Sequence, residues 1–404
     1  MRHIVFVNPV GVIGGAERVL LAAVDAVRTH AQVTVLLLGP GPLEAALRER
    51  GVAVRVLPLP LALSGVGDSQ LRNRGKLQAL ARLAVTVIAV SPHIVKFLRQ
   101  FRTMLRELRP TLVHSNGAKS HLLLALGGGK APVVWHVHDF YSERPLMAKL
   151  LRNVRKSVSH IVAISDAVKR DVEATLPGVA ATTVRNCVDT QHFSPLEREA
   201  KLPFRVGLVA TYANWKGHRV FLDALARLPS FVHGWIVGGP IYATAGSQVT
   251  QHELQSHANA LGIADRVTFL PFQPDPVNVY RMLDVVVHAS TRPEPFGLTI
   301  AEAMACGRAV VVAAAGGALE LFTDGVDAIG YPPGDAEDMA SAIGRILDEE
   351  PLRKQLETNA RLTAIRQFAP ERFGHELRAV YETTLQTSSI RQRSCDYLPA
   401  RFWK

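Results

Sequence analysis

Two glutamates, Glu294 and Glu302, lie close together in the stretch RPEPFGLTIAE. Pro293 and Pro295 exclude a helix interior around Glu294, which is therefore expected in a loop. A helix beginning near Gly297 would carry Glu302 about one turn from its start. Two carboxylates at such a junction can accept hydrogen bonds from the hydroxyl groups of a polar ligand.

The start of that predicted helix is also suited to an anion. The first N–H groups of a helix have no partner within it, and here they belong to Gly297, Leu298 and Thr299. Phosphate bound there, with carboxylates beside it for hydroxyl groups, describes a site for a nucleotide sugar. Acids that only stabilise the helix dipole are the alternative, which explains neither the prolines nor the glycines. A second glycine pair, Gly316 and Gly317, precedes the next predicted helix.

Lys216 follows a predicted strand in the stretch ATYANWKG and lies near the start of a helix. Its ammonium group is suited to a phosphate. An ordinary surface lysine is the alternative, although the helix dipole disfavours a cation at this end of a helix.

Two further motifs follow predicted strands in the first half of the chain. Gly14 and Gly15 lie between a strand and an amphipathic helix, where backbone N–H groups can approach an anion. A tight turn is the alternative. His138 alternates with His136 in WHVHDF, so both rings point the same way if the strand persists. An acid, a base or a donor to a leaving anion are possible roles for His138, and a satisfied half-buried histidine is the alternative.

The elements that position these residues are short apolar strands alternating with helices. HIVFV, QVTVLLL and PVVWHVH are typical of the first half, and FRVGLVA, VVVHAS and AVVVAA of the second. This pattern predicts parallel sheets covered on both faces. We therefore predict an α/β protein with two Rossmann-like doubly wound domains that face each other across a cleft.

The polar, proline-containing stretch 186–204 is the expected boundary between the domains. We expect an N-terminal, acceptor-binding domain over 1–190 and a C-terminal, nucleotide-sugar-binding domain over 191–370. A C-terminal helix at about 371–386 is expected to pack back on the first domain. Residues 387–404 have no clear period and are expected to form a loose basic tail.

Composition narrows the class of protein. The 404 residues are 48% apolar and 20% charged, as expected of a chain that buries sizeable cores. Three scattered cysteines favour a reducing compartment, so a cytoplasmic location is expected. No zinc-ligand spacing is present, and we expect no metal. The N-terminal apolar run is too short for a signal peptide, and no apolar stretch is long enough to span a membrane.

The net charge of +11 is unevenly distributed. Segment 64–110 carries nine lysines and arginines against two acids. Such a segment fits a solvated helix face and also an anionic membrane surface, and the sequence does not separate the two. Nucleic acid is disfavoured as a partner because no aromatic stacking platform or reader motif accompanies the charge.

At these motifs the chain resembles the family 4 retaining glycosyltransferases, which have two facing Rossmann-like domains, the GT-B architecture. The similarity spans most of the chain. EPFGLTIAE is its most specific motif, supported by GGAE, VHD, VAISDAV, the KG at Lys216 and GGALE. RNCVDTQHF resembles the interdomain segment of the family, with Cys187 in place of a glycine.

The resemblance implies roles for individual side chains. Glu294 would bind hydroxyls of the donor sugar near the reacting carbon, and Glu302 would bind the ribose. Lys216 would neutralise the diphosphate. His138 would contact the donor sugar or the leaving phosphate. Glu294, His138 and Lys216 are thus the expected catalytic residues.

Backbone groups complete the implied donor site. Gly15, next to Gly14, would bring an N–H group to the distal phosphate, and Gly297 and Leu298 would do so from the second domain. The family needs no metal or other cofactor. Transfer would keep the anomeric configuration through a front-side displacement, in which the leaving phosphate oxygen takes the proton of the acceptor.

One position departs from the family pattern. Thr211 stands where the family usually has an arginine, five residues before Lys216. Loss of such a charge-assisted donor costs on the order of 2–3 kcal/mol. Arg292 could substitute, Thr211 could donate a weaker bond, or activity could be reduced.

Three functions remain for this architecture. The first is sugar transfer from a UDP- or GDP-linked donor to a glycan, lipid-linked or small-molecule acceptor. The second is a weak or inactive sugar-nucleotide-binding protein, which Thr211 supports. The third is a nucleotide-sugar epimerase, which the spacing of Glu294 and Glu302 with the Lys216 loop disfavours.

Overall fold

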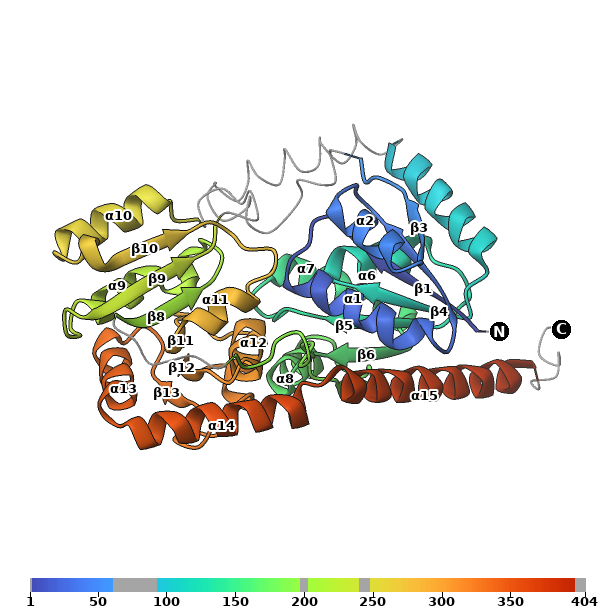
Figure 1. Ribbon diagram of the computed structural model, residues 1–404. Coiled ribbons are helices and arrows are strands. Elements are labelled where there is room, and N and C mark those ends of the chain that lie inside the picture. The colour runs from blue at the N-terminus through green and yellow to red at the C-terminus, as the bar shows by residue number, and fades with distance from the viewer. Residues whose placement is uncertain (1, 61–92, 197–202, 240–247, 397–404) are drawn as a thin grey trace. The chain divides into compact units, whose positions relative to one another are not determined.

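The computed structural model describes residues 2–60, 93–196, 203–239 and 248–396 of the chain (Figure 1). The chain forms two compact units, one of Met1–Val184 with Phe373–Lys404 and the other of Arg185–Arg372. Each unit is built around one parallel sheet with helices between its strands. The predicted α/β class with two Rossmann-like domains is confirmed.

Within the described part of the chain, the sheet of the first unit has seven strands in the order β3-β2-β1-β4-β5-β6-β7. All their pairings are parallel. Every residue of β1, β4 and β5 is buried, as expected of strands covered on both faces. The strands are β1 (His3–Asn8), β2 (Gln32–Leu37), β3 (Ala53–Val56), β4 (Leu112–Asn116), β5 (Val133–Val137), β6 (His160–Ala163) and β7 (Ala181–Thr183).

Helices of the first unit bury one apolar face each. In α1 the buried side chains recur every three or four residues, which is the period of an amphipathic helix. The helices are α1 (Gly15–Arg28), α2 (Pro42–Glu49), α6 (Ala118–Gly127), α7 (Pro145–Val154) and α8 (Asp166–Thr175), and residues 93–108 are also helical.

The sheet of the second unit has the order β10-β9-β8-β11-β12-β13, again with parallel pairings only. Its strands are β8 (Phe204–Val209), β9 (Val232–Val237), β10 (Val267–Leu270), β11 (Val285–His288), β12 (Ala309–Ala313) and β13 (Ile329–Tyr331). Its helices are α9 (His218–Leu225), α10 (Gln251–Ala260), α11 (Val277–Met282), α12 (Leu298–Ala305), α13 (Ala336–Asp348) and α14 (Glu350–Gln367).

In both sheets the order of the strands reverses beside the first strand of the unit. The reversal lies between β1 and β4 in the first unit and between β8 and β11 in the second. Open parallel sheets bind ligands at the carboxyl ends of strands at such a point. Gly14 follows β1, Lys216 follows β8 and Glu294 follows β11, so the sequence motifs lie at these reversals.

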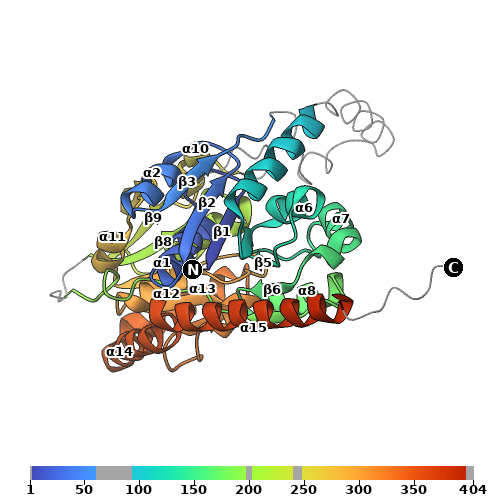
Figure 2. The same ribbon diagram turned by 90° about the vertical axis from the view of Figure 1, so that its right-hand side faces the viewer.

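The C-terminal helix α15 (Pro370–Asp396) is longer than expected. From Phe373 onward it belongs to the first unit, and it runs beside α8 and β6 of that unit (Figure 2). The expected end at residue 386 was wrong, because residues 387–396 contain no glycine or proline and the helix continues through them. The remaining expected tail, 397–404, lies outside the described residues.

Segment 185–194 belongs to the second unit, although the first domain was expected to reach residue 190. It has almost no regular secondary structure, so its carbonyl groups need other donors. Three arginine side chains supply them. Arg372 donates to the carbonyls of Arg185 and Asn186, Arg361 to that of Phe193, and Arg281 to those of His192 and Ser194.

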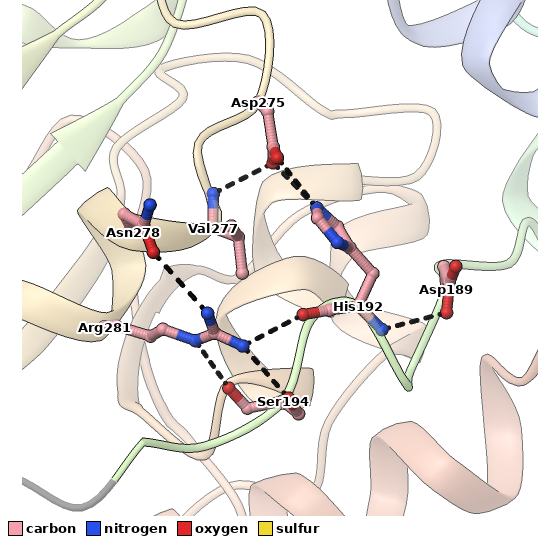
Figure 3. Close-up of polar contacts among 7 residues, drawn as sticks. All are labelled: Asp189, His192, Ser194, Asp275, Val277, Asn278 and Arg281. Carbon is pink, nitrogen blue, oxygen red and sulfur yellow. Dashed lines mark hydrogen bonds and ion pairs between the residues drawn. The ribbon is translucent and has the colours of Figure 1, made fainter.

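Figure 3 shows how α11 and the loop before it hold this segment. Arg281 also donates to the Ser194 hydroxyl at 3.0 Å, and His192 Nε2 lies 2.9 Å from both carboxylate oxygens of Asp275. Asp189 accepts a hydrogen bond from the backbone N–H of His192. The whole segment is therefore anchored by side chains of the second unit.

Candidate functional site

The carboxylate of Glu294 is held by three donors in the second unit. Lys216 donates to Oε1, while His288 Nε2, at 3.1 Å, and the Ser290 hydroxyl donate to Oε2. The side chain of Glu294 is 13% exposed, so this carboxylate is largely removed from water. A carboxylate offers about four acceptor positions, of which three are used here. One position therefore remains for a hydroxyl group of a ligand.

Electrostatics keep Glu294 ionised. Burial by itself would raise the pKa of this carboxyl group. The charge of Lys216 and the hydrogen bond from His288 act in the opposite direction, and together they hold the pKa of Glu294 well below its usual range. The group is thus an acceptor, and not a proton donor, at neutral pH.

The glycine loop seen in the sequence fixes the backbone of Glu294. The carbonyl oxygen of Glu294 accepts a hydrogen bond of 2.6 Å from the N–H of Gly317. Gly316 has φ +65°, and a Cβ atom on it would lie 2.6 Å from the same carbonyl oxygen. Only glycine fits this close approach in this conformation. The GGALE motif therefore positions the Glu294 loop.

Lys216 ends a short 3₁₀ helix, Asn214–Lys216, in the loop between β8 and α9. Gly217 follows with φ +70°, and a Cβ atom there would lie 1.8 Å from the carbonyl oxygen of Ala289. This contact brings the Lys216 loop against the chain that follows β11. An ammonium group carries three N–H donors, so Lys216 can bind Glu294 and still donate to an anion.

Glu302 lies in the second turn of α12 and is 5% exposed. Its Oε2 accepts a hydrogen bond of 2.8 Å from the hydroxyl of Tyr280 on α11. Gly297 caps α12 with φ +111°, so the helix begins at Leu298, one residue after the predicted start. Leu298 and Thr299 are half-buried in its first turn.

Thr211 follows β8 and is half-buried. Arg292, considered as a substitute for the missing arginine, is exposed in the loop before Glu294. Whether Arg292 or Thr211 takes over the phosphate contact of the missing arginine therefore stays a prediction.

The glycine pair of the first unit opens α1. The N–H of Gly14 donates to Oε2 of Glu17 at 3.1 Å, in a capping arrangement. This N–H is therefore already used within the protein. Gly15 is the first residue of α1 and is exposed, so its N–H is the one suited to an anion.

His138 lies just beyond β5 and is half-buried. Its Nε2 lies 2.6 Å from Oδ1 of Asn116, at the end of the neighbouring strand β4. Burial lowers the pKa of His138 to about 4, so the ring is neutral at physiological pH. His136 is fully buried, and its ring centroid lies 4.3 Å from that of His138.

Sequence reasoning missed several polar side chains that hold these groups. In the second unit they are His288, Ser290 and Tyr280, and in the first unit Asn8, Asn116 and Glu17. His288, Ser290, Asn8 and Asn116 share one detectable signal, because each is a polar residue at or just beyond the carboxyl end of an apolar strand.

Other features of the described residues bear on metals, thiols and membranes. No group of three or more His, Cys, Asp or Glu side chains in that part of the chain could hold a metal ion. Cys187 is buried, and burial raises its pKa to about 12. Among the helices that the structure describes, none has the length and apolar character required to cross a bilayer.

Comparison with protein families identifies the chain. Residues 13–192 match the model described as Glycosyltransferase Family 4, and residues 192–363 match that described as Glycosyl transferases group 1. The chain belongs to the family 4 glycosyltransferases of GT-B type. The two matches meet at residue 192, inside segment 185–194, which Arg281 and Arg361 help to hold.

Relatives of this family 4 glycosyltransferase have different substrates in their names. The D-inositol 3-phosphate glycosyltransferase of Mycolicibacterium smegmatis is 36% identical over 214 residues, covering 50% of this chain and 46% of that protein. The chain spans about half the length of these curated relatives. The lipopolysaccharide core biosynthesis mannosyltransferase LpsB of Rhizobium meliloti is 29% identical over 290 residues, covering 64% of this chain and 81% of LpsB.

Solved structures resemble nearly the whole chain. HepE of Anabaena, in complex with UDP and glucose, has a TM-score of 0.77 and 25% identity, covering 94% of this chain and 99% of HepE. Sucrose-phosphate synthase of Thermosynechococcus elongatus has a TM-score of 0.75 and 17% identity, covering 96% of this chain and all of that one. The latter likeness shows the fold alone.

Proposed function

We propose that this chain is a retaining glycosyltransferase that moves a sugar from a nucleoside diphosphate sugar to an acceptor. The observation that carries the proposal is the pairing of Lys216 with Glu294 at the strand reversal of the second unit. A buried carboxylate with one open acceptor position suits a sugar hydroxyl. A lysine with remaining donors beside it suits the diphosphate.

The rest of α12 and its neighbours would hold the nucleotide. The N–H groups of Leu298 and Thr299, in the first turn of α12, would bind a phosphate together with Lys216. Glu302, oriented by Tyr280, would accept hydrogen bonds from the ribose hydroxyls. From the first unit, the N–H of Gly15 would bind the distal phosphate and His138 would contact the donor sugar.

The proposed reaction breaks the bond between the anomeric carbon and the diphosphate oxygen. The electron pair of that bond goes to the departing diphosphate, and an acceptor hydroxyl forms the new bond on the same face of the sugar. The diphosphate oxygen takes the hydroxyl proton. The protein then acts by orienting the two substrates and by stabilising the negative charge that develops on the leaving group.

UDP is the nucleoside diphosphate that we favour as the leaving group, because HepE was solved with UDP and shares 25% identity over nearly the whole chain. GDP remains the second candidate. Glycan, lipid-linked or small-molecule acceptors all suit the proposal, which places the protein in polysaccharide or glycolipid biosynthesis. The lipopolysaccharide and inositol phosphate enzymes among the relatives support these acceptor classes.

The test is nucleotide release. Purified protein is incubated with UDP-glucose, UDP-galactose, UDP-N-acetylglucosamine or GDP-mannose, and free UDP or GDP is measured. We expect slow release with one of these donors and faster release when an acceptor is added. The proposal fails if every donor is returned intact, and recovery of an isomerised sugar nucleotide would indicate an epimerase instead.

Binding without turnover would favour the second candidate, a sugar-nucleotide-binding protein. Thr211 supports that candidate, because the usual arginine is missing from the predicted diphosphate site. Thermal unfolding with each donor separates the outcomes, since a ligand that binds the folded state raises the apparent stability. Replacing Thr211 with arginine should then increase the release rate if the clamp is what is lacking.

An anionic membrane surface is a further proposed partner. Residues 64–92 of the basic segment lie outside the described residues. In helix 93–108 the side chains of Phe97, Phe101 and Leu105 are buried, while Arg99 and Arg106 are exposed. The helix thus offers charge, and Phe97, Phe101 and Leu105 are used within the unit, whereas Val95 is exposed. This supports electrostatic attachment to acidic lipids.

Vesicle sedimentation tests this attachment. Replacing Arg99, Arg102 and Arg106 with glutamine should lower the fraction that sediments with phosphatidylglycerol-containing vesicles. Vesicles of phosphatidylcholine alone are the control. An unchanged bound fraction would count against the membrane proposal without affecting the proposed reaction.

A further inference from the structure

A series of three hydrogen bonds, here called the relay, ends at the ring of His138. Nε2 of His138 lies 2.6 Å from Oδ1 of Asn116, and Nδ2 of Asn116 donates to Oδ1 of Asn8 at 2.7 Å. Nδ2 of Asn8 donates to the carbonyl oxygen of Val10 at 2.7 Å. Asn8 and Asn116 are no more than 1% exposed, so the bond between their two amides is removed from water.

The carbonyl oxygen of Val10 sets which atom donates and which accepts in each of these hydrogen bonds. The carbonyl oxygen of Val10 can only accept a hydrogen bond, so the atom of Asn8 that faces it must be the amide nitrogen. The oxygen of Asn8 then faces Asn116 and must receive the amide nitrogen of Asn116. That leaves the oxygen of Asn116 facing His138, and Nε2 of His138 must carry the hydrogen.

Glu17 supports this direction. Its Oε1 lies 3.5 Å from Nδ2 of Asn8, which is a donor in the arrangement above. Its Oε2 accepts the N–H of Gly14. Glu17 is 4% exposed, and the donors around it lower its pKa, although burial, the larger effect, leaves that pKa above its ordinary value. Reversal of Asn8 would place an oxygen against both Val10 and Glu17.

We infer that Asn8, Asn116 and Glu17 are positioning residues that hold His138 as the Nε2–H tautomer and so present Nδ1 as a hydrogen-bond acceptor for a hydroxyl of the donor sugar. The inference rests on the proposed function for the identity of that ligand. It does not rest on it for the tautomer, which follows from the contacts alone. Within the described residues, Nδ1 of His138 has no hydrogen-bond partner from the protein.

The ring must be neutral for Nδ1 to accept a hydrogen bond. Burial keeps His138 in this state at physiological pH, as its lowered pKa indicates. The opposite tautomer would present an N–H group at Nδ1 and would donate to a hydroxyl oxygen or to a phosphate. The relay therefore selects a hydroxyl hydrogen as the partner of His138 and disfavours the leaving phosphate in that role.

The same relay connects His138 to the turn before α1. Glu17 accepts the N–H of Gly14 and lies beside the amide of Asn8, so one carboxylate contacts both the turn before α1 and the relay. The orientation of His138 and the turn that presents Gly15 are therefore expected to change together. Loss of the relay should affect a sugar contact and a phosphate contact in one step.

Nuclear magnetic resonance of the ligand-free protein tests the tautomer directly. Protein labelled with ¹⁵N at its histidines gives long-range proton–nitrogen correlations that separate protonated from unprotonated ring nitrogens. His138→Gln assigns the signal by its disappearance. We expect a protonated Nε2 and an unprotonated Nδ1 in the wild-type chain. A protonated Nδ1, or averaged signals from a mixture of tautomers, would overturn the inference.

Asn116→Leu removes the relay with little change in volume, and Asn153→Leu, at an exposed position of α7, is the matched control. We expect averaged ring signals for His138 in the first variant and wild-type signals in the second. If Asn116→Leu fails to fold, Asn116→Ala, which also removes the acceptor oxygen, is measured in its place. Wild-type signals in the folded Asn116 variant would also overturn the inference.

The kinetic effect is measured with the donor that the release assay identifies. Asn116→Leu should lower kcat/KM about tenfold, the equivalent of one hydrogen bond, while Asn153→Leu leaves it unchanged. If none of the tested donors is turned over, the proposed function fails and the tautomer result still stands. Turnover together with a mixture of tautomers in the wild type would support the proposed function and overturn the inference about His138.

Discussion

The ammonium group of Lys216 donates a hydrogen bond to the carboxylate of Glu294, which lies 78 positions further along the chain. The two residues come from the segments that follow β8 and β11, which are neighbours in the sheet. The pairing therefore depends on the strand order of the second unit. It also joins the two groups to which the proposed reaction assigns the donor sugar and the diphosphate.

Breaking this pair should make stability depend on pH in a characteristic way. In the wild type the pKa of Glu294 is held below its usual value, so its contribution to stability is present above about pH 4.5 and is lost as pH falls further. Lys216→Met leaves burial as the larger influence, which raises that pKa. The variant should lose about 2–3 kcal/mol of unfolding free energy at pH 7 and less at pH 4.

Urea denaturation of both proteins between pH 4 and pH 7 measures this difference. Taking the difference removes the effect of every group that the two proteins share. Lys149→Met, at an exposed position of α7, is the control and should stay close to wild type. A loss in Lys216→Met that is the same at all these pH values would contradict the assigned pairing.

Activity should respond to the same two residues as one unit. Lys216→Met and Glu294→Gln are each expected to lower kcat/KM by about 100-fold or more, because each removes a group that orients the donor or stabilises the leaving diphosphate. The double variant should be much less active than wild type but not lower by the product of the two factors. Strict additivity in steady-state assays would show that the residues act independently.

The sequence predicted the parts of this site that have distinct residue types. Lys216 and Glu294, which the sequence singled out for their charge and their place after strands, do lie together in the structure. The ligand roles of Glu294, Lys216 and Glu302 stay predictions. The close backbone approach at Gly316 and Gly217 was not predicted, because it depends on segments that are distant in the sequence. The alternation of apolar strands and helices was enough to predict two parallel sheets.

What the sequence could not provide is the set of partners that the sheet order brings together. His288 and Ser290 looked like the end of a strand, and Asn8 and Asn116 lie 108 positions apart. Their contacts depend on which strands are neighbours and on the register of β1 with β4. The length of α15 was missed for another reason, since the polar residues 387–396 have no apolar period but also no helix breaker.

Buried histidines should make the protein sensitive to mild acid. Burial lowers the pKa of His114 to about 3, while an unfolded chain would bind its proton near pH 6.5. Between these values the unfolded state holds more protons, so stability falls as pH falls through this window. His114→Asn should reduce the slope by up to about 1.4 kcal/mol per pH unit.

Asparagine is the chosen replacement because its amide oxygen can take the place of Nδ1, which lies 2.7 Å from the hydroxyl of Tyr381. His30→Asn, at an exposed position after α1, is the control and should keep the wild-type slope. The measurement is the unfolding free energy in urea at pH 4, 5, 6 and 7. Equal slopes in His114→Asn and wild type would show that His114 is not the source of the acid sensitivity.

Arg281 should be needed to anchor segment 185–194. Its guanidinium group donates to the carbonyl and the hydroxyl of Ser194 and to the carbonyl of His192, and lysine cannot reproduce this fork (Figure 3). Arg281→Lys should lower the unfolding free energy by about 1–3 kcal/mol. It should also speed trypsin cleavage after Arg185 relative to wild type.

Asn278→Ala is the matched control, because its side chain oxygen lies 3.5 Å from the same guanidinium group and contributes little. Thermal unfolding and timed proteolysis followed by mass spectrometry give both readouts. If Arg281→Lys and Asn278→Ala were cleaved at the same rate, the anchoring role would be excluded.

Two glycines separate the effect of crowding from that of backbone conformation. Gly217 and Gly262 have nearly the same φ, +70° and +69°, so alanine is strained by a similar amount at both. A Cβ atom on Gly217 would lie 1.8 Å from the carbonyl oxygen of Ala289, whereas one on Gly262 would have no atom within 4 Å. Gly262→Ala should therefore cost about 1 kcal/mol, the cost of the conformation alone.

Gly217→Ala should cost at least about 3 kcal/mol, because the backbone must also move to relieve the contact. That movement would displace Lys216, so donor binding should weaken in Gly217→Ala and stay unchanged in Gly262→Ala. Urea denaturation gives the two free energies, and titration with the identified donor gives the two affinities. Equal losses of stability at both positions would mean that the Lys216 loop is not pressed against the segment that follows β11. The contact at Gly217 would then not explain how Lys216 is placed beside Glu294.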